Sequence, residues 1–200
     1  MNKYIGILSA IFIFAGCSMK DVTKPIVKYT IDDDTRVVKV INQSDSILKI
    51  TAFKAPSYMY TSNIWYQKPN YETNSYLYSE WNENFTSLIE RNIANSIYES
   101  ALFKSSFTKY SKIKADILLE GEIVEAIQKV KNSGKSVVSF KVRLYLIKQE
   151  NNENLGLKEF SYEQECSTID AIGTIEAYNK IVKNLNKDVI AWLKILVTKN

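Results

Sequence analysis

Cys17 is the residue whose neighbours most clearly predict a chemical reaction. Residues 14–17 read Phe-Ala-Gly-Cys, and two small residues directly before a cysteine resemble a bacterial lipobox. In lipobox chemistry the cysteine thiol is diacylated, the peptide is cut before the cysteine, and the new amine is acylated. Several acyl chains on one residue give stable anchoring, since burial contributes about 0.8 kcal/mol per CH2. We therefore expect Cys17 to carry a lipid anchor, such as palmitate.

The chain before the lipobox has the features of a signal peptide. Lys3 supplies a positive charge, and the uncharged run Tyr4–Gly16 follows it. A membrane-spanning helix needs about 20 apolar residues, so this shorter run fits a signal-peptide core. We expect 1–16 to be a lipoprotein signal peptide, 17–27 a lipidated tether and 28–200 the folded domain. The alternative is an ordinary secretory signal in which the cysteine is accidental.

The residue after the lipobox predicts the compartment. Ser18 follows Cys17, where enterobacterial lipoproteins of the inner membrane carry Asp. By that sorting rule we expect a protein anchored in the outer membrane and facing the periplasm. Phe14 replaces the Leu that is usual in a lipobox.

The composition excludes most catalytic chemistries. The sequence has no His, which removes Ser-His-Asp and Cys-His nucleophile systems and every His-containing zinc site. It has no G-x-x-x-x-G-K-[ST] phosphate loop, so the chain is not itself an ATPase. The net charge of +4, from 26 basic and 22 acidic residues, is too small to indicate nucleic-acid binding. We expect no enzymatic activity, no cofactor and no resident metal.

For three further groups of side chains, a structural role is favoured over a functional one. Glu120 and Glu122 lie two apart and share one strand face, where a glycosidase could use them, but the pattern favours solvated positions. Asp32–Asp34 lacks the glycine and distal Glu of a calcium loop and is typical of a turn. Cys166 has no intramolecular partner if Cys17 is acylated, and we expect a small core or edge residue there.

An aromatic-rich stretch is the candidate contact surface. Residues 58–81 hold eight Tyr and Trp side chains, which combine a large apolar body with a polar group and suit interfaces. We predict Tyr58, Tyr60 and Tyr66 as partner contacts. The alternative is that the rings pack the sheet, since aromatic residues favour strands. Trp81, directly before a helix, is expected to be structural.

Hydrophobic periodicity predicts an α+β fold. Apolar residues at spacings of three and four predict helices over 82–103 and 175–198. Ala115–Ile127 has apolar or small residues at odd positions, with Glu125 as the exception, and 138–146 alternates in the same way, which predicts a long hairpin. Shorter strands are expected at 28–31, 47–53, 63–67, 72–78 and 157–166. We predict one antiparallel sheet of about six or seven strands with both amphipathic helices packed on one face.

The order of these elements resembles the ABC-type transport auxiliary lipoprotein family. A lipobox is followed by a strand with a Pro break, an aromatic strand pair ending in Trp, and a helix. An Ala-Asp-x-x-Leu-x-Gly strand, a hairpin and a C-terminal helix with Ala-Trp-Leu come next. The matching stretches are Ile50–Tyr60, Ile64–Trp81, Ala115–Glu122 and Ala191–Leu193. The family includes the outer-membrane lipoprotein of the paraquat-inducible intermembrane transport system.

The resemblance implies a function beside ABC transporters that carry mammalian-cell-entry proteins and move lipids or other hydrophobic molecules between two membranes. The expected partners are the membrane, through acylated Cys17, and a mammalian-cell-entry protein or transporter component. After Pro56-Ser57-Tyr58 many members have Leu and an acidic-basic pair, where this chain has Met59-Tyr60-Thr61. The alternatives are another envelope-assembly lipoprotein, such as a lipopolysaccharide-assembly plug or a secretion pilot protein, and a periplasmic enzyme.

Overall fold

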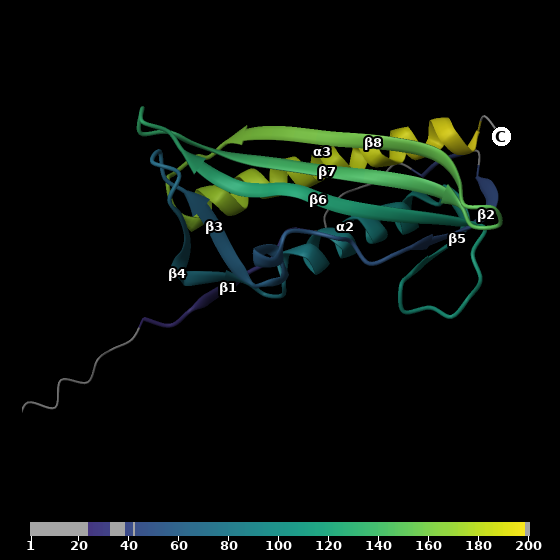
Figure 1. Ribbon diagram of the computed structural model, residues 1–200, viewed down its shortest axis with the longest axis horizontal. Coiled ribbons are helices and arrows are strands. Elements are labelled where there is room, and N and C mark those ends of the chain that lie inside the picture. Colours follow the sequence, from purple (N-terminus) through teal and green to yellow (C-terminus); the bar gives the residue numbers. More distant parts are fainter. Residues whose placement is uncertain (1–23, 33–38, 42, 199–200) are drawn as a thin grey trace, which may run out of the picture.

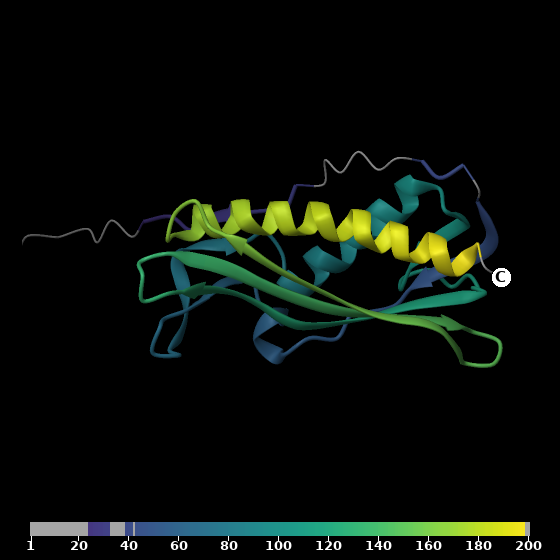
Figure 2. The ribbon, with the colours of Figure 1, turned by 90° about the horizontal axis from the view of Figure 1, so that it is seen from above.

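An eight-stranded sheet carries both long helices on one of its faces (Figures 1 and 2). The computed structural model describes residues 24–32, 39–41 and 43–198. The strands are β1 Val27–Tyr29, β2 Ser44–Ile50, β3 Asn63–Gln67, β4 Thr73–Trp81, β5 Phe103–Thr108, β6 Ile117–Val130, β7 Ser136–Lys148 and β8 Glu153–Glu165. The helices are η2 Ser57–Tyr60, α2 Phe85–Ser100 and α3 Ala171–Val197. The predicted α+β class is confirmed, with eight strands where six or seven were expected.

β6 is the strand around which the sheet is arranged. One of its edges pairs antiparallel with β7, which pairs antiparallel with β8. Its other edge pairs in parallel with β2 near its start and with β3 near its end. β1 with β4 and β2 with β5 are also parallel. Most paired residues lie in antiparallel ladders, as predicted, but these four parallel pairs are not evident in the sequence because alternation shows the buried face and not the partner's direction.

A β-bulge in β6 explains why Glu125 interrupts the apolar pattern. The register with β7 shifts between Ile123 and Glu125, which places one extra residue, Val124, in β6. Beyond the bulge the even positions Ala126 and Gln128 face the helices and are buried. Glu125 therefore lies on the opposite face of the sheet, which we call the open face.

Ile127 is placed differently from the sequence expectation for the same reason. The alternation predicts that it shares the face of the apolar odd positions before Glu125. The extra residue reverses the phase, so Ile127 lies on the open face opposite Ser139 of β7.

Local capping sets the ends of both helices. Asn84 caps α2 by accepting a hydrogen bond from the Ser87 N–H, so the helix begins three residues later than predicted. Ala101 adopts a left-handed conformation after Ser100 and ends α2 three residues early. Asp170 caps α3 by accepting from the Gly173 N–H, and that helix begins four residues earlier than its apolar stripe indicates.

β5 has no clear signal in the sequence. Its six residues, Phe-Lys-Ser-Ser-Phe-Thr, are mostly polar and lack strict alternation. The strand forms at the sheet edge through parallel pairing with β2, a contact between segments about 60 residues apart. Tertiary pairing therefore overrides a weak local preference.

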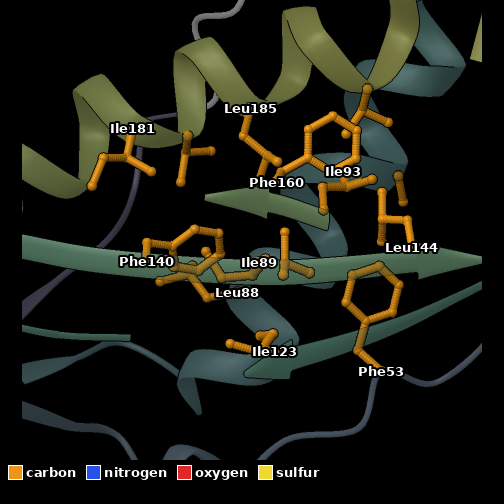
Figure 3. Packing of buried hydrophobic residues seen from close by; sticks show 14 of the residues in the cluster. Phe53, Leu88, Ile89, Ile93, Ile123, Phe140, Leu144, Phe160, Ile181 and Leu185 are labelled. Atoms are coloured by element: carbon orange, nitrogen blue, oxygen red, sulfur yellow. The ribbon is translucent and has the colours of Figure 1, made fainter. Parts of the chain in front are cut away.

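The core fills the space between the sheet and the two helices (Figure 3). Phe140 and Leu144 of β7, Leu88 of α2 and Leu185 of α3 are fully buried there, each contributing about 1.5–3 kcal/mol. Trp81 is also buried and meets Tyr178 edge to face, with ring centroids 5.5 Å apart. The structural role expected for Trp81 is confirmed.

Neither helix in the described part of the chain is both long and apolar enough to cross a membrane. α3 has 27 residues, and its buried stripe faces the sheet while most of its other positions are exposed.

Candidate functional site

The expected acylation residue Cys17 lies outside the described residues, as does the expected signal peptide at 1–16. The described chain begins at Lys24 and enters β1, where Val27 pairs with Ser79 of β4. The sheet therefore starts at the last residue of the expected tether. This beginning of the described chain lies at one end of the long axis (Figures 1 and 2).

A hollow of about 620 Å³ opens where β2 and β3 diverge along the edge of β6. The chain after β2 follows β6 as far as Lys54, whose N–H donates to the Gly121 carbonyl oxygen across 2.8 Å. Pro56 and the short helix η2 then turn away before β3 returns to pair with Gln128 and Lys129. We call this space the fork hollow.

The fork hollow has an apolar lining and a polar rim. The apolar lining consists of Pro56, Tyr58, Trp65, Val124 and Ile127. The rim consists of Gln67, Thr73, Glu125 and Lys141. A concave apolar surface with a few polar groups at its rim is typical of a binding site.

Tyr58 and Trp65 hold each other in place within the hollow. Their rings meet edge to face with centroids 5.7 Å apart. The Trp65 indole Nε1 donates to the Tyr58 backbone carbonyl oxygen across 3.2 Å, and the Thr61 hydroxyl donates to the same oxygen across 2.7 Å. Burial, together with the negative charge of Glu125, raises the pKa of the Tyr58 phenol.

Glu125 supplies fixed negative charge at the rim. The Ser139 hydroxyl donates to its carboxylate across 2.8 Å, and Lys129 forms an ion pair with it. Partial burial raises the pKa of Glu125, but the hydrogen bonds from Lys129 and Ser139 outweigh that effect and hold the pKa below its ordinary value. The carboxylate is therefore ionised at neutral pH and suited to binding rather than proton transfer.

The three predicted contact tyrosines do not share one surface. Tyr58 lines the fork hollow, whereas Tyr66 lies on the helix-covered side and packs against Tyr76 at 4.9 Å between centroids. Tyr60 is half exposed, and its hydroxyl donates to the Phe53 carbonyl oxygen and accepts from the Ala55 N–H, which fixes the turn after β2.

Trp65, Glu125 and Lys141 line the hollow but are not among the contact residues predicted from the sequence. A signal for Trp65 exists, because it alternates with Ile64, which is fully buried on the helix side. For Glu125 the sequence signal is its interruption of the apolar alternation, but the bulge that turns it to the open face depends on pairing with β7.

Two other candidate residues named from the sequence, Glu122 and Cys166, contact neighbouring side chains of the sheet. Glu122 lies on the open face and faces Arg143, which also pairs with Glu159 across 2.7 Å. Cys166 is a half-buried free thiol beside Gln128, and burial raises its pKa. In residues 24–32, 39–41 and 43–198, no three Cys, Asp or Glu side chains come close enough to hold a metal ion.

A second hollow, of about 830 Å³, lies at the other end of the domain between the end of α2 and β5. Its lining includes Ile97, Tyr98 and Phe103. Ala101, the left-handed residue that ends α2 before β5 begins, forms part of its wall.

Solved structures share this fold at low sequence identity. XCC0632 from Xanthomonas campestris, described as a DUF330 protein, has a TM-score of 0.76 and 12% identity over 86% of this chain and 98% of that one. An uncharacterized protein has a TM-score of 0.64 and 9% identity over 85% and 99%. The hypothetical protein CT253 from Chlamydia trachomatis has a TM-score of 0.56 and 10% identity over 78% and 100%.

At these identities the likeness shows a common fold and nothing more specific. No family profile and no curated protein sequence matches this chain.

Proposed function

We propose that this chain is a non-enzymatic, lipid-anchored accessory protein of an ABC transport system of the mammalian-cell-entry type. Such a system moves lipids or hydrophobic compounds between the inner and outer membranes. The lipobox at Cys17 and the order of motifs support this assignment. The fold shared with the DUF330 protein agrees with it. The proposed location is the periplasmic face of the outer membrane.

The fork hollow is the observation on which the proposal depends. Two aromatic rings and a proline line it, and opposite charges from Glu125 and Lys141 stand at its rim. Buried aromatic anchors surrounded by polar groups are the usual centre of a protein interface. We assign the hollow to an apolar or aromatic side chain from the periplasmic part of the transporter.

The mechanism is positional. A lipid on Cys17 confines the domain to one membrane, and the fork hollow then binds the end of a periplasmic bridge that starts at the other membrane. Confinement raises the effective concentration of the hollow for its partner, so a weak contact is enough for stable docking.

Photo-crosslinking in intact cells tests this assignment. A photoreactive amino acid replaces Thr73, an exposed residue at the rim of the hollow. The matched control replaces Tyr110, which is 83% exposed in the loop after β5. We expect a crosslink to a mammalian-cell-entry protein or transporter subunit from position 73 and none from position 110.

Two results would contradict the proposal. Capture of an outer-membrane assembly barrel, without any transporter component, would favour a different envelope-assembly role. Equal capture of a transporter component from both positions would support the proposed partner but would show that the fork hollow is not the docking surface.

A further inference from the structure

Four loops gather at the end of the molecule where the described chain begins (Figures 1 and 2). They are the segment 24–26, the β3–β4 turn at 68–72, the β6–β7 turn at 131–135 and the β8–α3 loop at 166–170. We call this end the anchor end. The ends of α2 and α3 lie at the opposite end of the long axis (Figure 1).

Large apolar side chains stand exposed at the anchor end. Tyr71 in the β3–β4 turn is 84% exposed, and Leu77 in β4 is 79% exposed. Ile169 in the β8–α3 loop and Ile172 in the first turn of α3 are each about half exposed. Exposed apolar residues also occur elsewhere, such as Tyr98 and Tyr110 at the opposite end, and these four are singled out because they lie in the elements nearest the start of the described chain.

Tyr71 occupies a backbone conformation that does not suit its side chain. Its φ is 68°, in the left-handed region that bulky residues rarely adopt. The position closes the turn, because the Tyr71 N–H donates to the Lys68 carbonyl oxygen across 3.0 Å. Glycine or asparagine usually fills such a position. Because the ring is also exposed, the strained backbone points to a contact of Tyr71 outside the chain.

The length of chain before the domain identifies what this end meets. Lys24 lies seven positions after Cys17, and a stretch of that length spans at most about 25 Å when extended. A lipid on Cys17 therefore holds the anchor end close to the bilayer. The surrounding loops carry Lys24 and Lys131, together with Lys68 and Lys135, which pair with Glu72 and Glu165. Both Lys and Tyr suit the headgroup region of a membrane.

We propose that the anchor end rests on the bilayer that holds the lipid anchor, with the Tyr71 ring among the lipid headgroups. This inference depends on the acylation of Cys17 that the proposed function requires. The long axis then points away from the membrane. Because α3 has 27 residues, the opposite end of the domain projects about 40 Å from the surface.

Tryptophan fluorescence in reconstituted membranes tests the orientation. The full, processed protein is purified from membranes and inserted into vesicles of phosphatidylethanolamine and phosphatidylglycerol, with and without brominated lipids. Tyr71→Trp and Tyr110→Trp place the same probe at two equally exposed tyrosines at opposite ends. Each spectrum is compared with that of the parent protein, which removes the signal of the native tryptophans.

We expect brominated lipids to remove most of the emission added by Tyr71→Trp and none of that added by Tyr110→Trp. Equal quenching of both probes, or quenching at position 110 alone, overturns the orientation while leaving the lipid anchor intact. A parent protein that does not float with the vesicles overturns the anchor and the orientation together. If quenching of Tyr71→Trp is lost only when a transporter subunit is added, the anchor end binds that protein in place of the bilayer.

Discussion

The Trp65 indole Nε1 donates a hydrogen bond to the backbone carbonyl oxygen of Tyr58 across 3.2 Å, and the two rings pack edge to face. This pair joins β3 to the short helix after β2, so the wall of the fork hollow is held by both segments. The hollow is thus formed before a partner arrives, which lowers the entropy that docking must overcome.

Removing the Trp65 ring should weaken docking without unfolding the domain. We expect Trp65→Ala to weaken binding of the periplasmic partner by about 2 kcal/mol, roughly 30-fold, because a central aromatic anchor is lost. Tyr98→Ala removes an exposed ring at the second hollow and is the matched control. Binding is measured with the purified partner, and circular dichroism verifies that both variants are folded. Equal weakening by both substitutions would rule out a specific role for the fork hollow.

The charge of Asp170 should stabilise α3 in a pH-dependent way. Hydrogen bonds from the Thr168 hydroxyl and the Gly173 N–H lower the pKa of this carboxyl below its ordinary value of 3.8. A lowered pKa in the folded state gives stability that is present above 3.8 and is lost as the pH falls through the folded pKa. Asp170→Ala should cost about 1 kcal/mol at pH 7 through loss of the cap.

Asp170→Asn separates the cap from the charge. Asparagine still accepts the Gly173 N–H bond, so the loss at pH 7 should be smaller than for Asp170→Ala. Chemical unfolding between pH 2.5 and pH 7 should show the difference from the parent shrinking below about pH 3.8. A difference independent of pH would show that the carboxylate charge contributes nothing.

Glycine at position 101 should stabilise the protein. Ala101 ends α2 at φ 52°, a conformation that costs an L-residue roughly 1–2 kcal/mol and costs glycine little. Glycine also increases the conformational entropy of the unfolded chain, which offsets part of this gain. We therefore expect Ala101→Gly to raise the free energy of unfolding by up to about 1 kcal/mol. Glu99→Gly, two residues earlier inside the helix, should lower it by about 0.5–1 kcal/mol. The same sign for both changes would contradict the left-handed end of α2.

A methyl group at Gly121 should collide with Phe53. A Cβ built at this position lies 2.6 Å from carbons of the Phe53 ring. Gly121→Ala should therefore cost about 1–3 kcal/mol by overpacking. In a double-mutant cycle, Phe53→Leu should relieve part of that cost, so the two changes together cost less than their sum. Simple additivity would mean that the ring does not cover Gly121.

Local patterns predict the elements of this fold better than their connections. Alternation identifies β6 and β7, and the spacing of three and four identifies both helices. Leu48 and Ile50 indicate that one face of β2 is buried, yet nothing in them shows that the strand pairs in parallel with both β5 and β6. Those pairings depend on contacts between distant segments.

The candidate site is predicted only in part for the same reason. Tyr58 is an evident candidate because Tyr and Trp are concentrated around it in the sequence. Its association with Glu125 and Lys141 depends on the bulge in β6 and on the divergence of β2 and β3. Tyr66 shares the composition of that stretch but faces the other side of the sheet, because the pleat of β3 points it away from its neighbour Trp65, which lines the hollow.

Metabolic labelling with a clickable fatty acid tests the central claim most directly. Cells expressing the parent chain or Cys17→Ser are labelled, and the protein is isolated and assayed for the fatty acid in each membrane fraction. We predict a labelled parent protein in the outer membrane, and an unlabelled variant that is soluble or retained as a precursor in the inner membrane. An unlabelled parent protein, or a variant that still fractionates with the outer membrane, would contradict the lipid anchor and the docking role that depends on it.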